Sequence, residues 1–595
     1  MAELLWKKIL TATGWLTGIR KSFTGLFIMF KKILLVILFT TVVSSELEAQ
    51  SPVSVPITDP VYGFLERMET LGYVHDLLDG VRPFSRKRVA AFLLDIKKHR
   101  AELTHIDRRR LDDYLLDYRY EIDPEKKYGQ ISEEQTTLYS PLAGWKRFTR
   151  DFRRFFQQIH PEEQNYVFLW EDGGNTFYFN FDMNLTYESR SDNLQRTGSW
   201  QDFLFRGQVS PRFGYQLNVS LQAVRGDDAY TLEHPILKGT WSQRPDKSGP
   251  RYADRTGGEL VYHTKYIDLT FAQQEIQWGM GESGRLILSR NPEQYPYIGV
   301  TADWGWGKFI AIQGKLLSFP QDTLSDGTKI YPDKWLAAHR LEVSPWNWLT
   351  LGLNENFIYG QRYMDWAYLF PLNFYRSVEH KLRDRDNATI SIDLELLPYQ
   401  GAKVYGTVFL DEFKASKLGT NWYGNKHAFS AGFYQVDPFG IPNFSLRLEY
   451  TAIMPWVYTH RYTINRYTSD YRSLGHWAGP NSEIWYVHIR QDLHQRFYLG
   501  LKLRQWKHGA NYPNENIGGD ILLGHGVLLG DQTEPRETRT FLEGILTTQR
   551  KVQLYAVYEV FNGLFLRAHY NIYHTNTEGA INNYNELFLG FKFRY

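Results

Sequence analysis

From about residue 166 onward, apolar and polar side chains alternate in segments of about ten residues. In TFYFNFDMNLTYES, every odd-numbered residue from Phe177 to Tyr187 is apolar or aromatic. The same period of two returns in YQLNVSLQA, FYLGLKLRQW, LFLRAHYNIY and NELFLGFKFRY. Such alternation places one kind of side chain on each face of a strand. Soluble β-sandwiches also alternate, so the period alone leaves two fold classes open.

The composition of the two faces decides between these classes. The polar faces are rich in Asn, Gln, Arg and Lys, which suits a water-filled lumen. Aromatic residues make up 16% of the chain, and they end the apolar faces as girdles at a membrane interface do. The sequence therefore predicts a mainly β fold, a closed transmembrane antiparallel β-barrel over residues 166–595. At about 24 residues per strand and connection, the barrel has about 18 strands.

An export signal precedes this region. The stretch MFKKILLVILFTTVVSSELEAQ begins at Met29 with two lysines, continues through an apolar run and relaxes into small and polar residues. This order predicts a signal peptide over residues 29–49, cleaved after Ala49. Residues 1–28 are interpreted as an over-extended start outside the mature protein. An exported chain without a later apolar run of helix-spanning length is periplasmic, secreted or a barrel in the outer membrane of a diderm bacterium.

Residues 50–165 have a helical period and are predicted to form an N-terminal α-helical domain. Three helices are expected, in TDPVYGFLERMETLGY, FSRKRVAAFLLDIKKH and DRRRLDDYLLDYRYE. Asp59 is expected to cap the first and Ser85 the second. The segment GWKRFTRDFRRFFQQIH, residues 144–160, is predicted to be a basic amphipathic helix. It either lies on anionic lipid or at the mouth of the pore, or simply packs on its neighbour.

Several simple chemistries find no support in the sequence. The chain has no cysteine, which excludes disulfides and thiolate metal sites. Its formal net charge of +2 gives no indication of a nucleic-acid partner. The histidines lack metal-binding spacing, so no cofactor is predicted. Ser283 in GESGR lacks the spacing of a nucleophile elbow, and an outer-membrane hydrolase is therefore an alternative that the residues do not favour.

Six segments are too polar for plain barrel wall. They are QWGMGESGRLILSRNPEQYPYIG, HRLEVSPWNWLTLGLNENFIYGQR, YLFPLNFYRSVEHKLRDRDNATISIDL, VFLDEF, DPFGIPNFSLRLEYTAIMPWVYTHRY and SLGHWAGPNSEI. In order and spacing they resemble the Wzi-type capsule assembly proteins of bacterial outer membranes, over nearly all of the mature chain. The stretch GFLERMETLGYVHDLLDGVRPFSRKRVAAFL resembles that family's N-terminal helices.

This resemblance implies a barrel of about 18 strands with a helical part on its periplasmic side. It also implies a lectin-like protein without catalysis, which holds capsular or extracellular polysaccharide at the cell surface. Further expected partners are outer-membrane lipid and the barrel assembly machinery, because a terminal aromatic strand is the usual assembly signal of such barrels. A diffusion porin or specific channel is the main alternative, although a porin needs no N-terminal helical domain.

Glycans are bound by aromatic faces and by polar groups on their hydroxyls, so mixed clusters of these residues are the candidates. Girdle positions for the aromatic residues and a solvated loop for the charged ones are the alternatives. A charged loop around residues 379–387 could instead fold over the barrel mouth. The candidate glycan-binding residues are Trp456, Tyr458, His460, Arg461, His476, Trp477, Asn481, Glu379, His380, Asp386 and Asn387.

Two further carboxylates have specific expectations. Glu449 shares a strand face with Arg447, so both should point into the lumen, where a structural ion pair is expected. Glu355 falls in step with the apolar Leu353 and Phe357. Because a carboxylate facing lipid is costly, a bulge or a position beyond the bilayer is expected there.

Overall fold

The computed structural model describes residues 52–122, 167–172, 175–237, 242, 249–323, 325–383, 385–417, 419–561 and 563–594. The predicted signal peptide, residues 1–28 and the basic segment 144–160 therefore lie outside the described residues. Within the described ranges, no helix combines the length and the apolar composition needed to cross a membrane.

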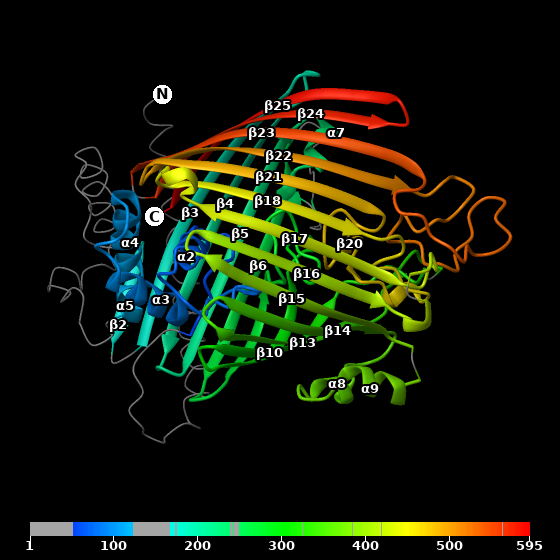
Figure 1. Ribbon diagram of the computed structural model, residues 1–595, viewed down its shortest axis with the longest axis horizontal. Helices are drawn as coiled ribbons and strands as arrows, with labels where there is room; N and C mark the ends of the chain where they lie inside the picture. The colour runs from blue at the N-terminus through cyan, green and yellow to red at the C-terminus, as the bar shows by residue number, and fades with distance from the viewer. Residues whose placement is uncertain are drawn as a thin grey trace, which may run out of the picture. The chain divides into compact units, whose positions relative to one another are not determined.

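Eighteen antiparallel strands close into a single barrel (Figure 1). They follow one another in chain order, and β25 closes the ring on β3 through pairs from Glu586–Arg190 to Arg594–Asp182. The predicted fold class and strand number are confirmed. The strands are β3 (Asn175–Arg190), β4 (Gln195–Val209), β5 (Phe213–Gly226), β6 (Arg251–His263), β7 (Asp268–Gln274), β9 (Tyr295–Asp303), β10 (Gly307–Leu316), β13 (Lys334–Trp346), β14 (Leu349–Gly360), β15 (Asn387–Tyr399), β16 (Ala402–Glu412), β17 (Lys426–Val436), β18 (Phe444–Ile453), β21 (Ser482–His494), β22 (Phe497–Ala510), β23 (Ile545–Phe561), β24 (Leu564–Thr577) and β25 (Ala580–Arg594).

Short strands and helices complete the fold. β2 (Phe168–Asp172) pairs with the first residues of β3, beyond the end of β25. The other short strands are β1 (Val81–Arg82), β8 (Gln277–Trp278), β11 (Asp322–Thr323), β12 (Lys329–Ile330), β19 (Thr468–Ser469) and β20 (Arg472–Ser473). The helices are α2 (Val61–Thr70), α3 (Arg86–Lys98), α4 (His105–Asp117), α5 (Arg119–Ile122), α7 (Asp228–Leu232), α8 (Trp366–Leu369) and α9 (Tyr375–Lys381).

The alternation in the sequence separates an outer and an inner face of the barrel. On β3, Asn184 and Thr186 are buried, whereas Leu185 between them is 44% exposed. Leu589 on the terminal strand is 45% exposed in the same way. A closed barrel whose apolar residues face outward requires lipid around it, because water cannot solvate such a belt favourably.

Connections between the strands are short at one end of the barrel and long at the other. β13–β14, β15–β16 and β21–β22 are joined by turns of a few residues, whereas the segments 274–295, 453–482 and 510–545 are long. In outer-membrane barrels the short turns face the periplasm and the long loops face outward. The two ends are named periplasmic and extracellular on this basis.

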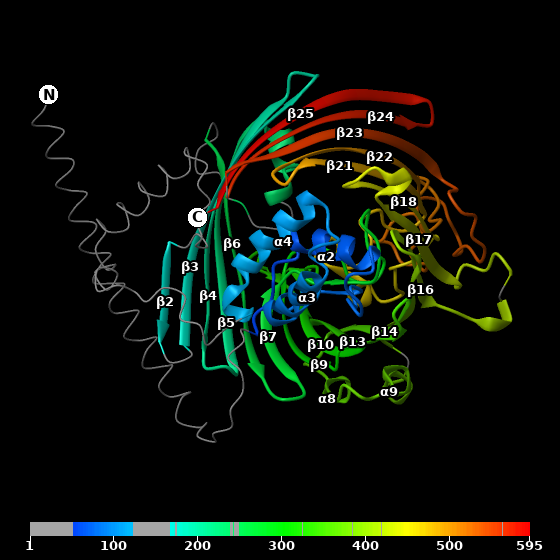
Figure 2. The same cartoon turned by 60° about the vertical axis from the view of Figure 1, so that its left-hand side comes forward.

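Residues 52–122 form a helical plug, which lies within the ring of strands (Figure 2). Asp59 accepts a hydrogen bond of 3.0 Å from the backbone N–H of Val61, and Ser85 accepts one of 3.2 Å from that of Arg88. Both predicted caps are confirmed. α4 begins two residues earlier than expected, because the Thr104 hydroxyl caps it. The plug has its own apolar core, which includes Leu65, Met68, Val89, Leu93, Ile96 and Leu111.

Two long loops fold into the lumen from the extracellular end and form a second apolar core. The hydroxyls of Tyr458 and Tyr467 donate hydrogen bonds of 2.8 Å to the carbonyls of Leu286 and Ile287. Leu288, Val457 and Leu474 are buried in the same cluster. This loop core joins segments 276–288 and 457–478 to the inner wall.

Helices α8 and α9 lie outside the barrel, beside β14 (Figure 1). Glu355 on β14 accepts hydrogen bonds of 2.9 Å from the backbone N–H groups of Tyr375 and Arg376. The strand ladder continues unbroken through Glu355, so the expected bulge is wrong. The carboxylate is covered by a helix start rather than by lipid. The charged segment around residues 379–387 thus begins on the outer face, with Glu379 and His380 in α9, and a contact of this segment with polysaccharide at the mouth stays a prediction.

Candidate functional site

Buried charges join the plug to the inner wall. Nζ of Lys403 on β16 lies 2.9 Å from Oε2 of Glu69 on α2 and 2.8 Å from Oε2 of Glu395 on β15. The Lys403 side chain is only 2% exposed. Since unpaired buried charges are strongly disfavoured, the wall lysine and the plug carboxylate each need the other in place.

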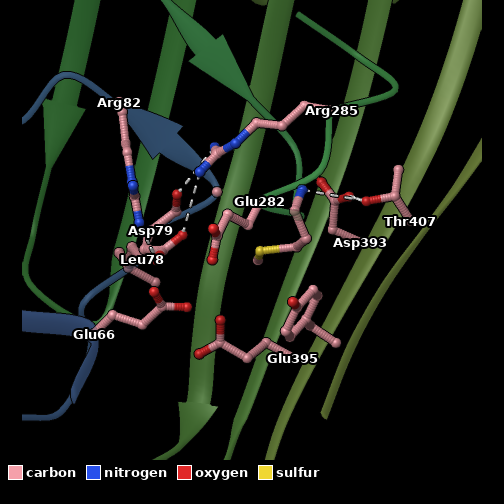
Figure 3. Close-up of polar contacts among 12 residues, drawn as sticks. Glu66, Leu78, Asp79, Arg82, Glu282, Arg285, Asp393, Glu395 and Thr407 are labelled. Atoms are coloured by element: carbon pink, nitrogen blue, oxygen red, sulfur yellow. Dashed lines mark hydrogen bonds and ion pairs between the residues drawn. The ribbon is translucent and has the colours of Figure 1, made fainter. Parts of the chain in front are cut away.

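Asp79 of the plug stands between two arginines (Figure 3). Its carboxylate lies 2.7 Å from Arg82 and 3.9 Å from Arg285, which belongs to the loop core. Burial opposes ionisation, but Arg82, Lys403 and Arg285 lower the pKa of Asp79 well below its ordinary value. The site therefore holds a carboxylate that stays charged, and it ties the plug to the loop core as well as to the wall.

Arg447 and Glu449 both point into the lumen, as expected from their shared strand face. Arg447 pairs with Glu66 of the plug at 2.8 Å and with Glu282 at 3.0 Å. Glu449 instead accepts hydrogen bonds of 2.7 Å from the backbone N–H groups of Glu282 and Ser283. Their charges thus hold the plug and the loop core, and among the described residues no ion pair joins Arg447 directly to Glu449.

The plug is also fastened to the periplasmic turns. Arg67 on α2 contacts Asp437, in the turn between β17 and β18, at 2.9 Å. The N–H of Gly401, in the turn between β15 and β16, donates to the carbonyl of Thr70 at 2.7 Å. These contacts place the plug at the periplasmic end, where the sequence resemblance expects the helical part.

Four of the residues expected to bind glycan are fully buried: Trp456, Tyr458, His476 and Asn481. Tyr458 belongs to the loop core. Nδ2 of Asn481 donates to the carbonyls of Gly509 at 2.7 Å and Glu543 at 2.8 Å, which connects its loop to the end of β22 and to the loop that follows that strand. In this arrangement these residues shape the loops that line the lumen.

Four more lie at the outer face or at the base of β15. Glu379 is buried and pairs with Arg376 at 2.6 Å, while His380 is exposed. Asp386 pairs with Arg362 at 2.6 Å, and Asn387 donates to the carbonyl of Asn465 at 2.9 Å. Glu379, His380 and Asp386 thus lie apart from the other candidates, whereas Asn387 contacts the loop segment 457–478.

The remaining three candidates are accessible. Arg461 is exposed, and its guanidinium carbon lies 4.9 Å from the ring centroid of Tyr462. His460 is half-buried beside it. Trp477 is half-buried, and its Nε1 donates to the carbonyl of Ser283 at 2.8 Å. A role for any of the eleven residues in glycan binding stays a prediction.

A row of four side chains crosses the inner wall next to Trp477. Strand register places Arg504 opposite Lys551, Lys551 opposite Tyr573, and Tyr573 opposite Tyr584. Directly opposite residues share one face of a sheet. Tyr486, the next member of the row, donates from its hydroxyl to Glu282 of the loop core, which identifies that face as the inner one. We call Arg504, Lys551, Tyr573, Tyr584 and Trp477 the inner-wall patch.

Within the patch, the two cations lie side by side and aromatic rings flank them. The Arg504 guanidinium carbon lies 4.6 Å from the Trp477 ring centroid, and Nζ of Lys551 lies 5.0 Å from that of Tyr573. The rings of Tyr573 and Tyr584 stack with centroids 4.5 Å apart. All five side chains are half-buried. Because they sit on paired strands and a packed loop, the patch is preorganised.

The two cations of the patch have no carboxylate in contact. In the part of the chain that the structure describes, neither Arg504 nor Lys551 forms an ion pair. Arg504 donates to the side-chain amide of Gln549 at 2.9 Å. Positive charge beside aromatic faces can bind a pyranose through its C–H face and through an acidic substituent.

Sequence reasoning had found Trp477 but not the four wall residues. Alternation assigns Arg504 and Lys551 to the polar face of a strand, as it does many other residues. Only cross-strand register brings them beside Tyr573 and Tyr584. A motif search along the chain contains no signal for such a row.

His476 makes the loop above the patch sensitive to acid. Its imidazole is fully buried, and burial together with the nearby Arg504 charge lowers its pKa to about 3. An opened loop would titrate near the ordinary value of about 6.5. Above pH 6.5 the buried imidazole therefore does not reduce the free energy of opening the loop. As the pH falls from 6.5 toward 3, this free energy decreases by about 1.4 kcal/mol per pH unit.

At pH 5 we expect hydrogen–deuterium exchange of residues 474–481 to be faster than at pH 7.5, after correction for intrinsic rates. The expected loss of stability is roughly 2 kcal/mol. His476→Leu removes the titrating group and should abolish the pH dependence in this segment. An unchanged acid effect in that variant would show that another group is responsible.

The barrel, the plug and the inner wall define a class: a plugged, membrane-spanning β-barrel whose lumen carries aromatic and cationic side chains. A profile of the family described as capsule assembly protein Wzi matches residues 204–580. The chain belongs to this family of outer-membrane proteins. No curated protein sequence matches it.

A solved structure of a similar barrel agrees with the fold. The structure titled as Wzi from Escherichia coli, an outer-membrane protein involved in group 1 capsule assembly and a carbohydrate-binding β-barrel, has a TM-score of 0.52 at 12% identity. The match covers 91% of this chain and 98% of that one. OpdK and OprD from Pseudomonas aeruginosa score 0.41 and 0.39, at 9% and 10% identity. They cover 70% of this chain and 98% and 95% of their own.

Proposed function

We propose that this protein holds an acidic exported polysaccharide at the cell surface through the inner-wall patch, and so assists assembly of a capsule or extracellular polysaccharide. The observation that carries the proposal is the row of Arg504, Lys551, Tyr573 and Tyr584 on one face of four adjacent strands. Membership of the capsule assembly family supports the same role. Carbohydrate binding by the similar barrel from Escherichia coli fits the proposal.

The proposed ligand is acidic because of the charges in the patch. Arg504 and Lys551 face each other on neighbouring strands without a carboxylate in contact, within the described residues. A uronic acid or another acidic substituent could accept hydrogen bonds from both, while Tyr573 or Trp477 stacks on a sugar face. Each contact is weak, but a repeating polymer engages many copies of the protein at once.

We further propose that binding proceeds without catalysis. The side chains of the patch are cations and aromatic rings, whereas glycoside hydrolysis requires a pair of carboxylates flanking the bond. A diffusion porin is less well supported, because the plug and the loop core both lie in the lumen. The signal peptide over residues 29–49, the helical domain over 50–165, the barrel limits 166–595 and recognition by the barrel assembly machinery stay predictions.

The test uses polysaccharide purified from the medium of a gene-deletion strain and the same polymer after chemical reduction of its carboxyl groups. Arg504→Gln and Lys551→Gln should each weaken binding of the untreated polymer by about 10- to 100-fold, since each removes a charged hydrogen-bond donor. Carboxyl reduction should weaken binding to the unmodified protein by a similar factor. It should have little further effect on the variants.

Arg550→Gln is the matched control, because Arg550 neighbours Lys551 on β23 but is exposed on the opposite face. Its binding should equal that of the unmodified protein. In cells, deletion of the gene should shift polysaccharide from the retained to the shed fraction. Unaltered binding by both patch variants would refute the site, and unaltered retention in the deletion strain would refute the function.

A further inference from the structure

An apolar groove lies on the outer face of the barrel beside α8 and α9. It has a volume of about 390 Å³, within the range of roughly 300–1,000 Å³ for small-ligand sites. Leu260, Phe271 and Ile298 line it from three adjacent strands, and each is exposed on the outer face. Ala311 of β10 forms part of its floor. The groove is thus continuous with the lipid-facing belt.

Helices α8 and α9 supply the raised wall of the groove, through Leu369, Pro371 and Tyr375. They are fixed to the barrel by polar contacts on its outer face. Gln313 on β10 donates to the carbonyl of Tyr368, and Nδ1 of His339 on β13 lies 3.2 Å from the carbonyl oxygen of Pro371. The polar outer residues of β10, β13 and β14 are thereby covered, so the wall is held rigidly against the strands.

The opposite side of this helix pair shows that it lies among lipids. Trp366 and Leu372 are 81% and 73% exposed, which is unfavourable in water. The end of α9 and the chain after it are basic: Lys381, Arg383 and Arg385 are all exposed. Because this segment belongs to the long connection between β14 and β15, its charges lie toward the extracellular end. Apolar side chains beside exposed cations are typical of binding to anionic lipid.

We infer that the groove binds one acyl chain of a phosphorylated glycolipid from the outer leaflet, with Lys381 and Arg383 beside its phosphate. The helix pair then selects one lipid from the surrounding bilayer, independently of the glycan in the lumen. Such a bound lipid would fix the orientation and depth of the barrel beneath the polysaccharide layer.

The probe is diphosphoryl lipid A, titrated into the delipidated full-length protein in detergent and followed by native mass spectrometry. Ala311→Trp fills the floor of the groove and should weaken binding at least about tenfold. The charge reversal Lys381→Glu with Arg383→Glu should have an effect of similar size. Ala568→Trp is the control, because Ala568 lies on the lipid-facing side of β24, in step with Leu566 and Tyr570.

If Ala311→Trp does not fold, Leu369→Glu places a charge in the wall of the groove and carries the same expectation. Unchanged affinity in the groove variants, or an equal loss in Ala568→Trp, would overturn the assignment. Phosphatidylglycerol and phosphatidylethanolamine serve as competing probes. Binding of either as tightly as lipid A would show that the groove holds ordinary phospholipid, and would likewise overturn the choice of ligand.

Discussion

Replacing Lys403 by methionine is expected to destabilise the contact between plug and wall by about 3–5 kcal/mol. The substitution leaves the carboxylates of Glu69 and Glu395 buried without the cation that lies 2.9 Å and 2.8 Å from them. The plug should then open locally more often. Hydrogen–deuterium exchange of α2 and protease cleavage within residues 52–122 would both report this opening.

The effect of Lys403→Met should depend on pH. Burial raises the pKa of Glu69, and the Lys403 charge opposes that rise. Without the lysine, protonation of Glu69 removes part of the uncompensated charge, so the variant should be less destabilised at pH 5 than at pH 8. Lys98→Met is the control, since Lys98 pairs with Asp95 at the surface and should change little. Equal exchange in the two variants would contradict the proposed role of Lys403.

Tyr458→Ala should destabilise the loop core by about 3–5 kcal/mol, as expected for loss of a large buried aromatic side chain. Tyr458 stacks on Tyr467 with ring centroids 5.5 Å apart, and its hydroxyl also accepts a hydrogen bond of 3.2 Å from the N–H of His476. Its loss should loosen segments 276–288 and 457–478 together. Exchange should accelerate in both, although they are far apart in the sequence.

Conductance in a planar bilayer gives a second readout of the loop core. The unmodified protein should be nearly silent, and Tyr458→Ala should produce transient openings. Tyr462→Ala is the control, because Tyr462 lies in the same loop but is 48% exposed. If Tyr458→Ala weakened polysaccharide binding without changing exchange or conductance, Tyr458 would contact the glycan directly rather than shape the loop.

Much of the architecture follows from local sequence. Polar and apolar residues alternate in segments such as 177–187 and 585–595. This pattern was sufficient to predict a membrane barrel with a polar lumen and an apolar outer face. Dividing the length of the barrel region by about 24 residues for each strand and its connection predicted the strand number that the structure confirms. The caps at Asp59 and Ser85 were likewise predictable. These features depend on neighbouring residues, because the direction of a side chain along a strand or helix repeats with a fixed period.

The sites were decided by tertiary structure. Glu355 reads as a carboxylate facing lipid until α9 is placed over it, and Tyr458 reads as a candidate glycan contact until Leu286 lies beside it. Lys551 and Tyr573 become neighbours only through strand register. Periodicity fixes the face on which a residue lies, but it contains no information about which distant segment covers that face or stands opposite. That choice belongs to the packing of the whole chain, in which buried charges and apolar loops must find partners far away in the sequence.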